Sequence, residues 1–148
     1  MLIRDLRAED KAEWLPLWRG YLDFYEHPWN AAEADDTFAR LLDPAVPMFA
    51  IVAEDEAGAL IGVAQCVLHL ATRTPGQFCY LNDLFTAPAA RKQGVGRALI
   101  EAVYARADQH GWPRVYWLTH ETNTPGRALY DKVGLNRGFI QYVRRPPA

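Results

Sequence analysis

The stretch from Arg91 to Gly96 combines the residue types and the spacing of an anion-binding turn. It reads Arg-Lys-Gln-Gly-Val-Gly, follows an apolar strand-like stretch at 79–86 and leads into a helix-like run at 97–107. The first N–H groups of a helix lack intrahelical partners, and the helix macrodipole places partial positive charge at the same end. Glycines let a ligand approach the backbone closely because no Cβ is in the way. The stretch therefore predicts a site for a phosphate-bearing ligand, and the alternative is an ordinary turn between a strand and a helix.

The spacing excludes two better-known phosphate loops. A dinucleotide-binding fingerprint requires a third Gly or Ala at position 99, where this chain has Leu99. A Walker A loop requires four residues between its glycines and a Lys-Ser/Thr pair after them, and neither is present. What remains is an Arg-x-x-Gly-x-Gly pattern after a strand.

A second motif follows the next strand-like stretch. Residues 123–134 read Asn-Thr-Pro-Gly-Arg-Ala-Leu-Tyr-Asp-Lys-Val-Gly. Asn123 and Tyr130 lie two helical turns apart, so both side chains can face the same groove. Together the two motifs, in this order and at this interval, resemble the signatures of the GNAT superfamily of acetyl-CoA-dependent N-acetyltransferases. The second motif departs from the family pattern at Gly126, where the family has Ala, and at Leu135, where Phe is usual.

The resemblance implies where acetyl-CoA binds. In the family, the strand before the loop splays from its neighbour at a bulge, and the pantetheine arm of the cofactor pairs with the exposed backbone. Here that strand end is 84–86, and the N–H of Leu84 matches the position that holds the thioester carbonyl, an interaction worth up to a few kcal/mol of barrier. The N–H groups of 93–97 match those that wrap the pyrophosphate, and Asn123 matches a residue that binds the pantetheine arm. The cofactor-binding residues implied are Leu84, Phe85, Thr86, Arg91, Lys92, Gln93, Gly94, Val95, Gly96, Arg97, Asn123, Gly126 and Tyr130.

The resemblance also implies proton-transfer roles. Tyr130 matches the tyrosine that protonates the departing thiolate, for which a phenol with a pKa of about 10 is a suitable donor; the alternative is a core tyrosine on an amphipathic helix. Only a free amine attacks a thioester, so a base is expected, and family members often carry a carboxylate on the strand before the loop. Asp83 is the carboxylate available there, although relatives of histone and polyamine acetyltransferases often have Glu-Asp where this chain has Asn82-Asp83. Tyr80 and His120 are the alternative bases.

The first pair of helix-like runs forms one wall of the acceptor site in the family. Aromatic faces beside carboxylates suit a cationic amine, through cation–π contact and charge pairing. The acceptor-binding residues expected are Trp18, Tyr21, Tyr25, Glu26, Trp29, Tyr80 and His120. The alternative is that these aromatics belong to the core and that the acidic residues form a solvated helix face.

The run of aromatic residues at 14–25 and the ending Gly138-Phe139-Ile140 resemble the histone/polyamine acetyltransferase-like branch. This likeness leaves the acceptor open among a polyamine, an amino acid amine, an aminoglycoside-like compound and a protein lysine. A second function class is a domain that binds acyl-CoA without catalysis, as a sensor or partner module. Retention of Tyr130 and of the base candidates favours the enzyme.

The apolar periodicity predicts an α/β fold with a mixed sheet, in the order β-α-α-β-β-β-α-β-α-β and with splayed central strands. The helices are expected near 8–25, 31–42, 97–110 and 126–133. The strands are expected at 2–6, 49–54, 60–70, 79–86, 114–119 and 138–143. Pro16 leaves the start of the first helix open, whereas Gly111 and Pro113 predict the end of the third.

Composition sets the outer limits. With 148 residues and 50% hydrophobic content, residues 1–148 are expected to form a single acetyltransferase domain. The balance of 16 basic and 18 acidic residues predicts no nucleic-acid partner, and the lack of a long apolar run predicts no membrane contact and a cytoplasmic location. Cys66 and Cys79 have no metal-like spacing and are expected to be buried, reduced thiols, with no metal bound. Because the last expected strand has no successor to cover its edge, a homodimer is also expected.

Overall fold

A five-stranded mixed sheet forms the centre of the computed structural model, which describes residues 1–147. The strands are β1 (Leu2–Asp5), β2 (Met48–Glu54), β3 (Leu60–Ala71), β4 (Thr74–Thr86) and β5 (Arg114–Tyr116), and they lie side by side in chain order. The first four are antiparallel neighbours, and β5 is parallel to β4. Helix α3 connects β4 to β5, as a parallel connection requires.

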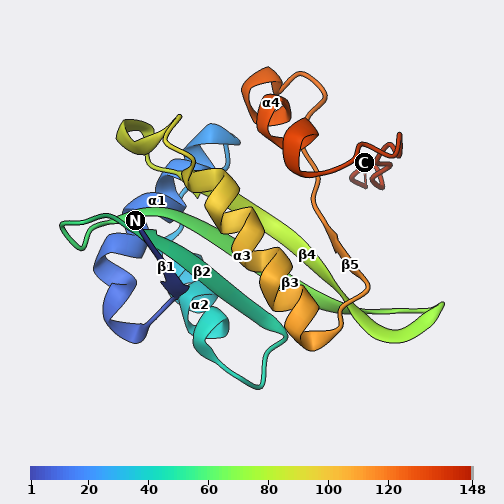
Figure 1. Cartoon of the computed structure of the whole chain (residues 1–148), viewed down its shortest axis with the longest axis horizontal. Coiled ribbons are helices and arrows are strands. Elements are labelled where there is room, and N and C mark those ends of the chain that lie inside the picture. Colours follow the sequence, from blue (N-terminus) through green and yellow to red (C-terminus); the bar gives the residue numbers. More distant parts are fainter. Residues whose placement is uncertain (148) are drawn as a thin grey trace. The chain divides into compact units, whose positions relative to one another are not determined.

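Helices cover both faces of this sheet. The chain forms α1 (Lys11–Phe24), α2 (Ala31–Leu42), α3 (Val95–His110) and α4 (Thr124–Val133), with short 3₁₀ turns at Ala8–Asp10 and Pro88–Ala90. Figure 1 shows α3 lying across the near face of the sheet, with α1 and α2 behind it. The mixed α/β fold expected from the sequence is confirmed.

The core has two layers because the sheet has two covered faces. Trp14 and Leu17 of α1 and Phe38 of α2 pack with alternate residues of β2 and β3. On the other face, α3 contributes Leu99 and Ile100, both fully buried. The mostly aromatic face of α1 is therefore largely a packing surface, as its helical spacing predicts.

Two glycines allow these layers to approach closely. A Cβ on Gly20 of α1 would lie 2.6 Å from the ring of Phe85, and a Cβ on Gly62 of β3 would lie 2.7 Å from Val95 of α3. Either substitution would push a helix away from the sheet. These positions hold α1 and α3 against β4 and β3, next to the segment that carries the candidate site.

The described residues fall into two compact parts, 1–118 and 119–147. The first part contains the sheet, α1, α2 and α3. The second contains α4 and an ending at 135–147 without helix or strand. None of residues 119–147 is buried.

The strand expected at 138–143 is wrong. Residues 135–147 form no strand, and the side chains of Phe139 and Tyr142 are 83% and 88% exposed. Gly138 has a φ of 81° and its N–H donates to the Asn136 side chain at 2.9 Å, so the chain turns where the strand was expected to begin. Alternation of apolar and polar residues is typical of a strand, but a strand also needs a neighbour to accept its ladder.

Smaller differences concern element ends and the thiols. β5 ends at Tyr116 instead of residue 119, and β4 begins at Thr74 instead of 79. Cys66 and Cys79 are free and buried, which confirms that expectation. Hydrogen bonding to Cys79, followed by burial, raises the pKa of the Cys66 thiol. Within residues 1–147 no helix has the length and hydropathy to cross a bilayer.

Candidate active site

Strands β4 and β5 separate after three pairs. Phe78–Tyr80 of β4 pairs with Arg114–Tyr116, and β4 then continues to Thr86. In the part of the chain that the structure describes, residues 81–86 have a strand neighbour on the β3 side only. A strand edge of this kind presents backbone N–H and C=O groups to a partner. The opening between β4 and β5 is called the fork below.

The chain leaves the fork through the loop that opens α3. Lys92 has a φ of 63° and Gly94 a φ of 82°, both in the left-handed region, and the helix begins at Val95. A Cβ at Gly94 would meet no atom within 4 Å, so the space above the loop is open. The first turn of α3 therefore offers its N–H groups to an anion, as predicted for residues 91–97.

Two basic side chains of this loop already have partners. The Arg91 guanidinium lies 5.5 Å from the centre of the Phe85 ring and its Nε donates to the Thr86 carbonyl at 3.3 Å. Arg97 pairs with Glu101 at 2.8 Å on the exposed side of α3. The backbone and Lys92 are thus the freer contributors to an anion site.

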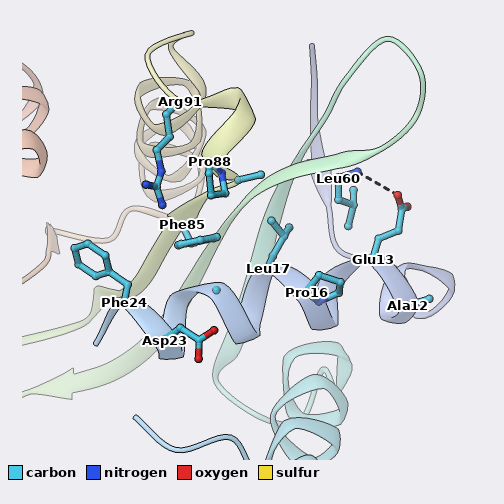
Figure 2. A pocket seen from close by; sticks show the side chains of 12 residues that line it. Ala12, Glu13, Pro16, Leu17, Asp23, Phe24, Leu60, Phe85, Pro88 and Arg91 are labelled. Atoms are coloured by element: carbon cyan, nitrogen blue, oxygen red, sulfur yellow. Dashed lines mark hydrogen bonds between the residues drawn. The ribbon is translucent and has the colours of Figure 1, made fainter. Parts of the chain in front are cut away.

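An apolar groove of about 650 Å³ runs between α1 and the end of β4. Figure 2 shows Phe24 and Leu17 projecting from α1 on one side, with Phe85, Pro88 and Arg91 on the other. Gly20 lies on the α1 side of this groove and leaves room for the Phe85 ring. The guanidinium of Arg91 enters it, so the groove joins the loop to the face of β4 that α1 covers.

A buried hydrogen-bond chain ends on Asp83. The indole N–H of Trp14 donates to Gln65 Oε1 at 2.7 Å, and Gln65 Nε2 donates to Asp83 Oδ2 at 2.8 Å. Asn82 Nδ2 donates to the other carboxylate oxygen at 2.9 Å. A bulge at Asn82, marked by a register shift opposite Gln65 and Cys66, turns the Asp83 side chain toward α1.

Burial raises the pKa of Asp83, and hydrogen bonds from Gln65, Tyr21 and Asn82 lower it in opposition. The net direction is upward, which brings the carboxyl closer to the range of a useful base. Asp83 is 9% exposed. Among residues 1–147 no group of three or more His, Cys, Asp or Glu side chains lies close enough to hold a metal ion.

Three tyrosines surround the carboxylate. Burial is the main cause that raises the pKa of Tyr21 and of Tyr25, and the negative charge of Asp83 raises both further. Burial, followed by the proximity of Tyr116 and Asp83, raises the pKa of Tyr80. The Tyr21 hydroxyl donates to the Asn82 carbonyl at 3.4 Å. These phenols stay protonated near neutral pH and surround a buried anion.

The other expected acceptor residues divide. Trp18 and Trp29 pack against the core beside α1, which supports the alternative that some of these aromatics are core residues. Trp18 also stacks between Trp14 and Tyr21, with ring centres 5.8 and 5.4 Å apart. Glu26 is exposed just after α1, in a left-handed backbone conformation. The structure thus brings Tyr21, Tyr25 and Tyr80 to the surroundings of Asp83, whereas Trp18 and Trp29 pack against the core.

The remaining expected residues lie in the second part of the chain. Asn123 caps α4: its Oδ1 accepts from the Gly126 N–H at 3.3 Å, and its Nδ2 donates to Thr119 Oγ1 at 2.9 Å. A Cβ at Gly126 would lie 2.4 Å from the Asn123 side chain, so this departure from the family pattern accommodates the cap. Tyr130 lies on α4 and is half-exposed, not buried in a core. His120 is exposed at the start of this part.

Sequence reasoning missed three side chains near this site. Gln65 is a polar residue in the mostly apolar strand β3, and that contrast was an available signal. His69 and Tyr116 are joined by a hydrogen bond of 2.7 Å across 47 residues of chain, for which the sequence carries no signal.

Known proteins resemble this chain in sequence and in fold. Residues 14–135 match the family model described as the acetyltransferase (GNAT) family. The chain is 37% identical over 145 residues to the D-amino-acid N-acetyltransferase HPA3 of Saccharomyces cerevisiae, covering 97% of this chain and 90% of that protein. It is 29% identical over 150 residues to the uncharacterized N-acetyltransferase YhfO of Bacillus subtilis, covering 100% and 99%. A solved structure of a probable acetyltransferase matches the fold with a TM-score of 0.87 at 21% identity, covering 100% of this chain and 99% of that one.

Proposed function

The chain belongs to the GNAT acetyltransferase family and is an acyltransferase, and we propose that it moves the acetyl group of acetyl-CoA directly to a primary amine while both substrates are bound. The observation that carries this proposal is the fork, which leaves residues 81–86 of β4 open and leads straight into the loop at the start of α3. We also propose that residues 1–148 form one acetyltransferase domain, because the family match runs across both compact parts.

The residues of the fork and loop fit acetyl-CoA. An open strand edge suits the amide-bearing pantetheine arm, and the left-handed Gly94 beside the first turn of α3 suits the pyrophosphate. Bound acetyl-CoA supplies an activated acyl thioester. We assign the arm to residues 84–86 and to Asn123, and the pyrophosphate to the N–H groups of residues 93–97.

The chain's own groups then act on the amine and the thioester. The N–H of Leu84 is proposed to donate to the thioester carbonyl oxygen. Asp83 is proposed to take the proton from the acceptor ammonium, directly or through a water, so that the amine lone pair becomes available. The burial that raises the pKa of Asp83 supports this role, because a base works best when its pKa approaches the working pH.

Tyr130 is proposed as the acid that protonates the leaving thiolate. Its half-exposed position on α4 supports this role over the alternative of a core tyrosine. Asn123 at the start of the same helix fixes the first turn through its cap, two turns before Tyr130.

The acceptor is proposed to be a small cationic amine, an amino acid amine or a protein lysine. The buried carboxylate of Asp83 with Tyr21, Tyr25 and Tyr80 around it supports recognition of an ammonium group. The relative that acts on D-amino acids, at 37% identity, supports including D-amino acids among the acceptors tested. The resemblance to the histone/polyamine acetyltransferase-like branch would instead favour a polyamine as the acceptor.

A panel of amines tests the proposal. The chain is incubated with acetyl-CoA and either polyamines, D- and L-amino acids, an aminoglycoside or a lysine peptide, and release of free thiol is followed. We expect thiol release that depends on at least one amine and that is lost in Tyr130→Phe. Binding of CoA without amine-dependent release for any acceptor would instead favour the non-catalytic acyl-CoA-binding module.

A further inference from the structure

Strand β5 is too short to hold its own position. It contributes three residues, Arg114–Tyr116, at the edge of the sheet and contacts the sheet through a single neighbour. A ladder of three pairs has little stability by itself. Since β5 forms the second side of the fork, something else must keep its end in place.

One anchor lies on the face of the sheet that α1 covers. The Tyr116 hydroxyl lies 2.7 Å from His69 Nε2, and His69 Nδ1 lies 2.8 Å from the Leu70 carbonyl oxygen. Because a carbonyl oxygen only accepts, Nδ1 carries the proton, and Nε2 accepts from the Tyr116 hydroxyl. The bond reaches from β5 over β4 to β3. The Tyr116 ring also stacks on Tyr80, its partner in the last pair of the ladder, at 4.9 Å.

A second anchor lies on the opposite face. The next residue, Trp117, packs its ring against Tyr104 of α3 with centres 6.3 Å apart. Successive residues of an extended chain point to opposite faces. Tyr116 and Trp117 therefore tie the end of β5 to β3 on one side and to α3 on the other, at the residue where β4 and β5 part.

We infer that the His69–Tyr116 hydrogen bond and the Trp117–Tyr104 contact are positioning interactions that hold the fork at the width acetyl-CoA requires. The inference rests on the proposed function, because the fork is where the pantetheine arm is assigned. Without these anchors the end of β5 would move, and the fraction of molecules with a competent fork would fall. A ligand's apparent dissociation constant rises in inverse proportion to that fraction.

The test measures CoA affinity by calorimetry on the full chain. Tyr116→Phe and His69→Leu should each raise the dissociation constant of CoA about two- to tenfold, the range of one net hydrogen bond. The double variant should match either single variant, because both remove the same bond. His69→Gln, whose amide oxygen can accept from Tyr116, should restore most of the affinity. His110→Leu is the matched control, since His110 also bonds a carbonyl oxygen and stacks on an aromatic ring, but at the far end of α3.

Amide hydrogen exchange in the absence of ligand separates the two possible failures. Residues 114–118 should exchange faster in Tyr116→Phe and in Trp117→Leu than in the unmodified chain, with the other strands unchanged. If the unmodified chain binds no CoA, the proposed function is wrong, and the exchange data still test the anchors. If it binds CoA while Tyr116→Phe and Trp117→Leu keep the same affinity and the same exchange, the anchoring role is overturned.

Discussion

Asp83 and Tyr130 are the two side chains proposed to move protons. They lie in parts of the chain that differ in burial, since the first part has a buried core and the second has no buried residue among those described. Asp83 is buried within residues 1–118, at the end of a hydrogen-bond chain from Trp14 and Gln65. Tyr130 lies on α4, and none of residues 119–147 is buried. A buried proton carrier has its pKa set by its surroundings, whereas a half-exposed phenol keeps access to ligand. Substitutions in the first part should therefore change stability and function together, and those in the second part should separate them.

The largest effect is expected at Tyr130. Tyr130→Phe should lower kcat by about 10²–10⁴, because the leaving thiolate loses its proton donor. The melting temperature should change little, because Tyr130 is half-exposed. Steady-state kinetics and thermal unfolding on the same sample measure both quantities. If the variant has the same kcat as the unmodified chain, Tyr130 is not the general acid.

Trp14 should show the reverse pattern. Its side chain is fully buried and donates to Gln65, so Trp14→Ala should lower the free energy of unfolding by about 3–5 kcal/mol. Leu135→Ala in the second part, where the side chain is 84% exposed, should change it by less than about 0.5 kcal/mol. Urea unfolding followed by tryptophan fluorescence and circular dichroism measures both. Equal losses would show that the difference in burial does not govern stability.

The loop gives a comparison within one helix. Gly94 and Gly111 cap the two ends of α3 with φ values of 82° and 68°, and a Cβ at either would meet no atom within 4 Å. Gly94→Asp should weaken CoA binding at least about tenfold, because a carboxylate then faces the pyrophosphate. Gly111→Asp imposes similar backbone strain and should leave the affinity unchanged. Calorimetry in which both variants bind CoA equally well would contradict the assignment of the loop.

Asn82 offers a smaller change at the buried proton carrier. Its amide donates to Asp83, and this hydrogen bond lowers the pKa of that carboxyl. Asn82→Ala should therefore raise the pKa of Asp83. On acidification, the variant should then lose the active, ionised carboxylate at a higher pH than the unmodified chain does. The acid limb of the kcat/KM profile should therefore move to higher pH, which lowers the activity measured on that limb. A profile that does not move would favour a base other than Asp83.

The exposed ending of the chain predicts a dimer, whose mass is twice that of a single chain. Phe139, Ile140, Tyr142 and Val143 are each at least three-quarters exposed, and an apolar surface of this kind is typical of an interface. We propose that a second copy covers it, although not by the strand edge expected from the sequence. Light scattering should give twice 16.8 kDa, and Ile140→Asp should return it to the single-chain mass. A single-chain mass for the unmodified protein would remove the homodimer.

Helices and turns of this chain could be predicted from short stretches of sequence. Asn30 caps α2 by accepting from the Glu33 N–H, and the helix covers 31–42 as expected. The loop at 91–96 and the motif at 123–134 lie at the starts of α3 and α4. A helix hydrogen-bonds residues four apart, and its caps lie within one turn of its ends, so the information that determines it is contiguous.

Strand ends and the surroundings of Asp83 depended on the tertiary structure. The pattern at 138–143 is as strand-like as that of β3, yet only β3 has neighbours to pair with. Gln65 and Asp83 meet because β3 pairs with β4 in one register, and the bulge at Asn82 decides which face Asp83 joins. A strand obtains its hydrogen bonds from residues distant in the chain, and a shift of one residue reverses every side chain after it. The residue types were therefore readable from the sequence, while their partners and faces were determined only when the strands came together.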